Sequence, residues 1–175
     1  MIKLVPFQQS DFDTLISWID SKELLVQIAG NVFSYPLTIA QLQRYSDDKK
    51  SLSFNIVDVS KNKVIGHAEI YLSDDASCKL DKILIGDKSM RGKGFGQHVI
   101  NELLEYSFMK LGVKKVELNV YDWNIAGIRC YEKAGFAVNK DKKNSTQVDG
   151  NEWVAINMTI DKDIWVEQKQ LTGLS

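Results

Sequence analysis

The sequence predicts a single domain of the α+β (mixed α/β) class. Two observations predict it: apolar residues recur at helical spacing in residues 1–50, and a period of two then takes over from Ser53 to Ile85. Two strand-and-helix units complete the chain, and this mixed order excludes a regular doubly wound fold. No repeat, low-complexity segment or linker interrupts the sequence, so residues 1–175 are expected to form one domain.

The front of the chain is expected to form a short strand over 2–7 and helices near 11–19, 22–29 and 38–45. Each helical segment places its apolar residues three or four positions apart, which gives one buried face. Gly30 follows the second of these helices, where glycine commonly ends a helix. The front therefore contributes mainly helices.

An antiparallel meander is expected next, with strands over 53–59, 64–72 and 78–85 joined by short polar turns. Alternating apolar and polar residues in these segments are typical of strands that bury one face. Such a meander supplies the centre of the predicted sheet.

The last part of the chain is expected to alternate helices and strands. A helix over 99–111 precedes a strand over 116–121, and a helix over 124–134 precedes strand-like segments from Phe136 onward and over 153–160. These segments extend the sheet and cover it.

Composition excludes several classes of protein. Lys and Arg number 22 against 23 Asp and Glu, so no strong field attracts nucleic acid or an anionic membrane, and neither is an expected partner. The two cysteines and two histidines show no metal-ligand spacing, so no metal is expected. No signal peptide or membrane-spanning run is apparent, and a reduced, cytoplasmic location is expected.

A glycine-rich turn lies between the strand over 78–85 and the helix over 99–111. It reads Arg91-Gly92-Lys93-Gly94-Phe95-Gly96-Gln97. Glycine permits positive φ and close approach of a ligand, while the start of a helix offers free N–H groups and the positive end of its dipole. The combination favours a phosphate site. The alternative is a tight strand-to-helix turn that glycine permits and that binds no ligand. The spacing does not match a dinucleotide fingerprint, and a P-loop would need Ser or Thr after Gly92-Lys93.

Two blocks of the sequence resemble the GNAT (GCN5-related N-acetyltransferase) superfamily. Arg91-x-x-Gly94-x-Gly96 resembles the acyl-CoA signature of that family, and Asn124 to Phe136 resembles its second signature, with the alanine one place early at Ala126. The order of helices and strands from Ile2 to Ile160 also matches. The resemblance implies a mostly antiparallel twisted sheet flanked by helices and splayed between the strands at 78–85 and 116–121.

The resemblance further implies that acetyl-CoA is the cosubstrate. The amides of Gly92 to Gln97 would hold its pyrophosphate, with charge added by Arg91 and Lys93. The backbone of Ile83, Leu84 and Ile85 would pair with the extended pantetheine arm.

Two residues of the second block have a structural and a functional interpretation. Asn124 is a good helix N-cap, and in the family the matching asparagine also binds pantetheine. Tyr131 could be a core residue, whereas the resemblance implies that it is the general acid that protonates the departing CoA thiolate. Gly135 and Phe136 are expected to end the helix and anchor it to the core.

The general base is left open between two carboxylates. Asp81 precedes Arg91 by ten positions, close to where several family members place an acidic base, and it is expected to share one strand face with Ile83 and Ile85. Glu69, on the preceding strand, is the alternative. Either could instead be a paired or solvent-facing carboxylate, and a water could relay the proton. His67 and His98 are expected to be packing or surface residues.

The predicted activity is transfer of an acetyl group from acetyl-CoA to a primary amine by direct attack. The acceptor is expected to enter beside the front helices and the loop 32–36, which could also simply pack on the core. Four aromatic residues are the candidates for this pocket: Trp18, Phe33, Tyr35 and Trp123. A protein amine and a small amine remain open as acceptors, as do a monomer and a homodimer, and the alternative function is a non-catalytic acyl-CoA sensor.

Overall fold

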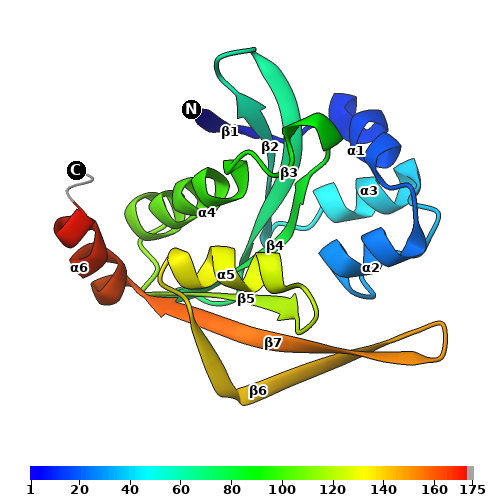
Figure 1. Ribbon diagram of the computed structural model, residues 1–175. Coiled ribbons are helices and arrows are strands. Elements are labelled where there is room, and N and C mark those ends of the chain that lie inside the picture. Colours follow the sequence, from blue (N-terminus) through cyan, green and yellow to red (C-terminus); the bar gives the residue numbers. More distant parts are fainter. Residues whose placement is uncertain (173–175) are drawn as a thin grey trace.

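The computed structural model describes residues 1–172, and the last three residues of the expected domain, 173–175, lie outside it (Figure 1). Within the described residues, one seven-stranded sheet has the order β1-β2-β3-β4-β5-β7-β6. Its strands are β1 Ile2–Pro6, β2 Ser51–Asp58, β3 Lys63–Leu72, β4 Ser77–Ile85, β5 Lys115–Tyr121, β6 Ala137–Val148 and β7 Asn151–Asp161. The helices are α1 Phe12–Trp18, α2 Lys22–Ala29, α3 Ile39–Ser46, α4 Phe95–Glu105, α5 Ile125–Lys133 and α6 Lys162–Thr172. The α+β class predicted from the sequence is confirmed.

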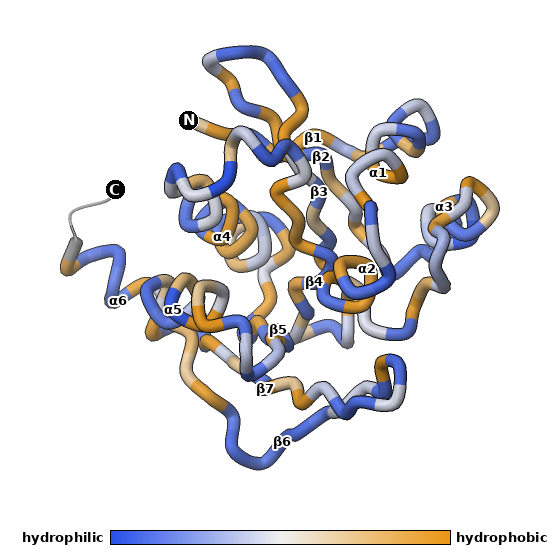
Figure 2. Tube along the Cα trace, turned by 45° about the vertical axis from the view of Figure 1, so that its right-hand side comes forward, coloured by the Kyte–Doolittle hydropathy of each residue, from blue (hydrophilic) through white to orange (hydrophobic). Residues whose placement is uncertain are grey.

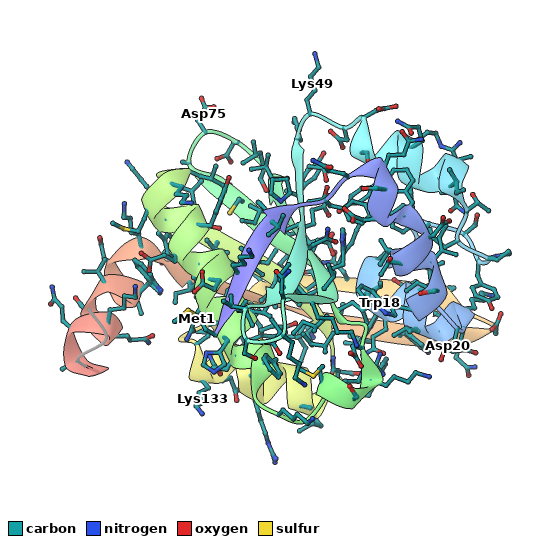
Figure 3. The ribbon with its side chains drawn as sticks, turned by 90° about the horizontal axis from the view of Figure 1, so that it is seen from above. Met1, Trp18, Asp20, Lys49, Asp75 and Lys133 are labelled. Atoms are coloured by element: carbon teal, nitrogen blue, oxygen red, sulfur yellow. The ribbon has the colours of Figure 1, made fainter. Side chains whose placement is uncertain are left out.

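The helices form two groups on either side of the strands, as Figures 1 and 3 both show. The larger apolar cluster joins the sheet to α4 through Val99, Ile100 and Leu103, and α6 adds Trp165. The smaller cluster joins Leu84 of β4 to α1, α2 and α3. The sheet therefore has a hydrophobic layer on each face near β4.

Two of the front helices begin at the side-chain caps that their sequences offer. The Ser21 side chain accepts a hydrogen bond from the Leu24 amide at the start of α2, and Thr38 accepts one from Gln41 at the start of α3. Each bond satisfies one of the amides that a helix leaves unpaired at its first turn. The bounds expected for α2, 22–29, are those of the structure.

Strands β4 and β5 are parallel neighbours for only part of their length. They pair from Ser77–Lys115 to Leu80–Leu118 and then separate, whereas every other pair of neighbours in the sheet is antiparallel. The splay implied by the resemblance is confirmed. It leaves the second half of β4 with a free edge toward β5.

A β-bulge in β4 corrects one expectation of the sequence. Glu69 pairs with Asp81 and His67 with Leu84, so two residues of β4 oppose Ala68 alone. The extra residue reverses the alternation of side chains beyond it. Asp81 therefore does not share a face with Ile83 and Ile85: those two pack against the α4 cluster, and Leu84 packs against the front helices.

The β6–β7 hairpin projects past α2 (Figure 1). Its β6 strand is mostly hydrophilic and exposed along its length (Figure 2), as is common for the edge strand of a sheet. The turn between the two strands carries Asp149, which forms an ion pair with Lys22 of α2. No helix within residues 1–172 is long and apolar enough to cross a membrane.

Candidate active site

The glycine-rich turn lies between β4 and α4 and leaves the start of α4 open. Gly92 has a φ of 71° and Gly94 a φ of 79°, and a side chain at either position would meet no neighbouring atom within 4 Å. Gly94 is the N-cap of α4, and no side chain of the described residues caps this end. The first amides of α4 can therefore bind an anion, as the sequence predicts for Gly92 to Gln97.

Arg91 anchors this turn to β4. Its Nε donates a hydrogen bond of 2.8 Å to the Ile85 carbonyl. The carbonyl belongs to the last residue of β4, so the bond fixes the turn relative to the free edge of that strand. Lys93 is exposed on the same turn and adds a positive charge.

Helix α5 packs beside the start of α4, and its own start is capped by Asn124. The Asn124 side chain accepts a 3.0 Å hydrogen bond from the Gly127 amide, so its expected N-cap role is confirmed. A side chain on Gly96 would come within 3.6 Å of the Cys130 sulfur, which shows how closely the two helices approach. The two sequence blocks thus lie side by side.

Tyr131 lines a cavity between the separating halves of β4 and β5. Residues of both strands line it, together with Asn124 and residues of α2: Gln27, Ile28, Leu80, Asp81, Lys82, Ile83, Leu118, Asn119, Val120, Tyr121, Asn124 and Tyr131. Burial raises the pKa of Tyr131, and the nearby Cys130 and Asp81 raise it further. The phenol therefore carries its proton at neutral pH.

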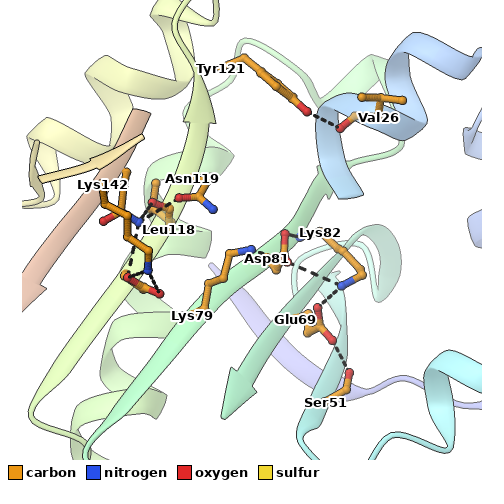
Figure 4. A network of polar contacts seen from close by, with 12 residues as sticks. Val26, Ser51, Glu69, Lys79, Asp81, Lys82, Leu118, Asn119, Tyr121 and Lys142 are labelled. Atoms are coloured by element: carbon orange, nitrogen blue, oxygen red, sulfur yellow. Dashed lines mark hydrogen bonds and ion pairs between the residues drawn. The ribbon is translucent and has the colours of Figure 1, made fainter. Parts of the chain in front are cut away.

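Lys82, which also lines this cavity, belongs to a buried ion pair. Lys82 bonds to Glu69, which also accepts a hydrogen bond from Ser51 (Figure 4). The Lys82 side chain is 6% exposed and that of Glu69 is 1% exposed. Lys82 also approaches Asp81 at 3.7 Å. We call these four residues the Lys82 cluster: Ser51, Glu69, Asp81 and Lys82.

The conformation of Lys82 explains how its side chain reaches Glu69. Lys82 has a φ of 48° and occupies the bulge of β4. Its ammonium lies 5.0 Å from the centre of the Tyr45 ring, which adds a cation–π contact. A buried charge is tolerated only when it is paired, and here both the carboxylate and the ring supply that pairing.

His67 is a second buried polar residue in this region. Its Nε2 lies 3.1 Å from the Tyr45 hydroxyl, and its Nδ1 has no hydrogen-bond partner within the described residues. Burial, with a smaller effect of nearby Lys82, lowers the pKa of His67 to about 3. Neutral and buried, His67 packs as predicted, and His98 lies on the surface as predicted.

Asp81 is the residue at which three cavities meet. It lines the cavity of Tyr131, a larger one of about 550 Å³ beside α3, and a third that reaches α2 and the β6–β7 hairpin. Its carboxylate is 22% exposed and accepts hydrogen bonds from the Lys82 amide and from the Lys79 ammonium, both at 3.0 Å. Asp81 is therefore more accessible than Glu69, which borders the 550 Å³ cavity but is only 1% exposed.

The four aromatic candidates do not gather in one pocket. Phe33 lines the 550 Å³ cavity and also packs against the front-helix cluster. Trp18 packs against Gly86, where its ring occupies the space that a side chain would need. Tyr35 is exposed and donates to the Asp20 carbonyl, and Trp123 is exposed and stacks on Tyr121.

Sequence reasoning missed Lys82, Lys79 and Tyr45. The signal for Lys82 was a lysine directly before the apolar strand end Ile83 to Ile85, although nothing local shows that its partner is Glu69. No group of three possible metal ligands is found within the described residues.

Comparison with known proteins identifies relatives of this chain. The sequence profile of the acetyltransferase (GNAT) family matches residues 18–136. An N-acetyltransferase 9-like protein of Nematostella vectensis is 23% identical over 146 residues, covering 77% of this chain and 74% of the relative. The human alpha/beta-tubulin-N-acetyltransferase 9 is 24% identical over 148 residues, covering 77% and 72%.

Solved structures share the fold across nearly the whole chain. A spermidine N-acetyltransferase from Vibrio cholerae, solved with CoA and spermine, has a TM-score of 0.81 at 20% identity and covers 94% of this chain and 98% of its own. An aminoglycoside acetyltransferase, AAC(6')-Ib, solved with coenzyme A, has a TM-score of 0.75 at 20% identity and covers 97% and 99%.

Proposed function

The chain belongs to the acetyltransferase (GNAT) family, and from this premise we propose that it transfers an acetyl group from acetyl-CoA to a primary amine at the splay between β4 and β5. One observation carries the proposal: Tyr131 of α5 lines a cavity with the separating half of β4, and the open start of α4 packs beside α5. An anion site, an extended edge and a proton donor are the three things that a CoA thioester needs from its enzyme.

The pyrophosphate of CoA binds to the amides of Gly92 to Gln97 in this proposal. The positive φ values of Gly92 and Gly94 turn the backbone toward the ligand, and Arg91 and Lys93 supply positive charge. The pantetheine arm runs along Ile83, Leu84 and Ile85, whose edge is not paired with β5. Asn124 holds the second helix beside it.

Catalysis proceeds by direct attack of the amine on the thioester carbonyl. The amine first loses a proton, then forms a tetrahedral intermediate, and the C–S bond breaks to release CoA. Tyr131 gives its proton to the departing thiolate, and the raised pKa of this phenol keeps the proton available at neutral pH.

Asp81 is the base that we favour over Glu69. Asp81 borders all three cavities and is partly exposed, so an entering ammonium can reach it. Glu69 is already bonded to Lys82 and Ser51, and its role is to hold that lysine. The preference for Asp81 therefore rests on its accessibility to the acceptor and on the bonds that already engage Glu69.

The acceptor enters through the larger cavity beside α3. Its charged residues balance, with Arg44, Lys79 and Lys82 against Asp48, Glu69 and Asp81. A polyamine carries several positive charges and would bind better to a cavity with an excess of acidic groups. An acceptor with a single amine therefore suits this cavity better, whether it is a small molecule or a polypeptide. The free cysteines, Cys78 and Cys130, fit a reduced compartment such as the cytoplasm.

The test is calorimetry with acetyl-CoA followed by release of free thiol against a panel of amines. We expect binding, and turnover with at least one member of the panel. Binding without turnover for every amine would favour a non-catalytic acyl-CoA sensor. If acetyl-CoA did not bind, the proposal would be wrong.

A further inference from the structure

A primary amine of the protein itself already occupies the place expected for the acceptor. The Lys79 ammonium lies 3.0 Å from Oδ2 of Asp81, the carboxylate at which the three cavities meet (Figure 4). Lys79 lines two of those cavities, and its side chain is 27% exposed. An entering acceptor would have to take this position beside Asp81.

The register of β4 places Lys79 next to the point at which β4 and β5 separate. Lys79 pairs with Glu117 in the parallel part of β4 and β5, and Asp81 is the first residue of β4 after this pairing ends. Lys79 and Asp81 share one face because they are two residues apart, before the bulge at Lys82. The amine therefore faces the acceptor side of the region in which the thioester is proposed to bind.

We propose that Lys79 is a self-acetylation site: when no amine acceptor is present, the protein transfers an acetyl group from bound acetyl-CoA to its own Lys79. This inference rests on the proposed function. It concerns Lys79 and not Lys82, because Lys82 is bonded to Glu69 and nearly inaccessible, whereas Lys79 contacts one carboxylate and borders open space.

The chemical step is the same as with an external amine. Asp81 accepts a proton from the Lys79 ammonium, and the neutral Nζ attacks the thioester carbonyl. The new C–N bond forms, the C–S bond breaks, and the thiolate leaves with a proton from Tyr131. The second proton of Nζ returns to the Tyr131 phenolate and restores the phenol. The products are N-acetyl-lysine and free CoA. Acetylation removes the charge of Lys79 and with it the ion pair to Asp81.

Lys142 provides a matched control within the same chain. Its ammonium lies 2.9 and 3.0 Å from the two carboxylate oxygens of Glu117, so it is also a paired and partly exposed lysine. It borders none of the three cavities around Asp81. Chemical acetylation by acetyl-CoA in solution would affect both lysines, whereas transfer within the site would affect Lys79 alone.

The experiment incubates the full chain with isotope-labelled acetyl-CoA and no amine, and follows each lysine by peptide mass spectrometry. The label separates new acetylation from any present after expression. We expect Lys79 to be acetylated about a hundredfold faster than Lys142, because a positioned base and acid assist only Lys79. The rate constant should not change with protein concentration, since transfer is within one chain.

Three variants sharpen the result. Tyr131→Phe should slow acetylation of Lys79 and leave that of Lys142 unchanged. Lys79→Arg keeps a cation beside Asp81 and should abolish the fast mass increase of the intact chain. Lys142→Arg should leave the modification of Lys79 unchanged.

Equal labelling of Lys79 and Lys142 would overturn the inference, and so would a rate that rises with protein concentration. Calorimetry and the amine panel, run on the same preparation, separate this failure from that of the proposed function. If acetyl-CoA binds and an amine is turned over while Lys79 stays unlabelled, only the inference on Lys79 is wrong. If acetyl-CoA does not bind, both are wrong.

Discussion

The glycine-rich turn and the Lys82 cluster lie at the two ends of the free half of β4, and they are built in different ways. The turn presents backbone amides, positive φ values and an uncapped helix start at the surface. The cluster presents side chains from β2, β3 and β4 that are joined by a buried ion pair and a hydrogen bond. The difference teaches that the turn, proposed to bind the cofactor, is encoded locally, whereas the cluster beside the proposed acceptor cavity depends on strand pairing.

Breaking the buried ion pair should give the largest effect and should act on stability. Glu69→Ala leaves the Lys82 ammonium buried without its carboxylate, and we expect a loss of about 3–5 kcal/mol in the free energy of unfolding. Urea denaturation measures it. Ser51→Ala, which removes one hydrogen bond and keeps both charges, should cost about 1 kcal/mol.

The double variant Glu69→Met with Lys82→Met tests whether the stability lost in Glu69→Ala comes from the unpaired charge of Lys82. Removing both charges together should recover most of the stability lost in Glu69→Ala, because no unpaired charge remains. If Glu69→Ala were as stable as the unchanged protein, Lys82 and Glu69 would not form a buried ion pair.

The general acid should give the next largest effect, and it should act on turnover alone. Tyr131→Phe removes the proton donor and keeps the ring, so we expect turnover to fall about 100-fold while the acetyl-CoA dissociation constant changes little. Thiol release and calorimetry measure the two quantities. Equal losses in both would assign Tyr131 to packing.

The sequence predicted the glycine-rich turn and the start of α5 well because their determinants are neighbours in the chain. Glycine spacing and the apolar helix after it identified Gly92 to Gln97, and Asn124 was identified as a cap from its position alone. The order and approximate bounds of the helices and strands followed from periodicity for the same reason.

The sequence could not predict the bulge or the Lys82 cluster. A single extra residue at Lys82 reverses which face of the sheet the following side chains of β4 point to. No local sequence pattern indicates this bulge. The partners Ser51 and Glu69 come from two other strands, so only the register between strands brings them together. Aromatic character alone does not define one pocket, since Trp18 packs against Gly86 and Trp123 stacks on Tyr121.

Acid should weaken the protein through His67, an intermediate effect on stability. The unfolded chain binds a proton at His67 below a pH of about 6.5, and the folded protein resists it until a pH of about 3, so stability falls as the pH falls through 6.5. This group adds a slope of about 1.4 kcal/mol per pH unit.

Urea denaturation between neutral pH and the onset of carboxylate titration measures that slope. His67→Gln should flatten it, and His98→Gln, a change at an exposed histidine, should leave it as it is. An identical slope in all three proteins would contradict the buried neutral state of His67.

The smallest expected effect concerns the turn itself. Gly94→Ala and Gly112→Ala each place a side chain at a positive φ, 79° and 72°, with no neighbouring atom within 4 Å. Each should therefore cost about 1 kcal/mol of stability through backbone strain alone. Only Gly94→Ala should weaken acetyl-CoA binding, by several-fold in calorimetry. Equal acetyl-CoA affinities of the two variants would show that the turn does not bind the cofactor.

A crystal structure of the protein with bound CoA tests the division between the two regions most directly. We expect the pyrophosphate oxygens about 3 Å from amide nitrogens of Gly92 to Gln97, the pantetheine along Ile83 to Ile85, and the sulfur facing Tyr131. CoA bound away from the splay of β4 and β5, or with its pyrophosphate held by the Lys82 cluster, would contradict the account.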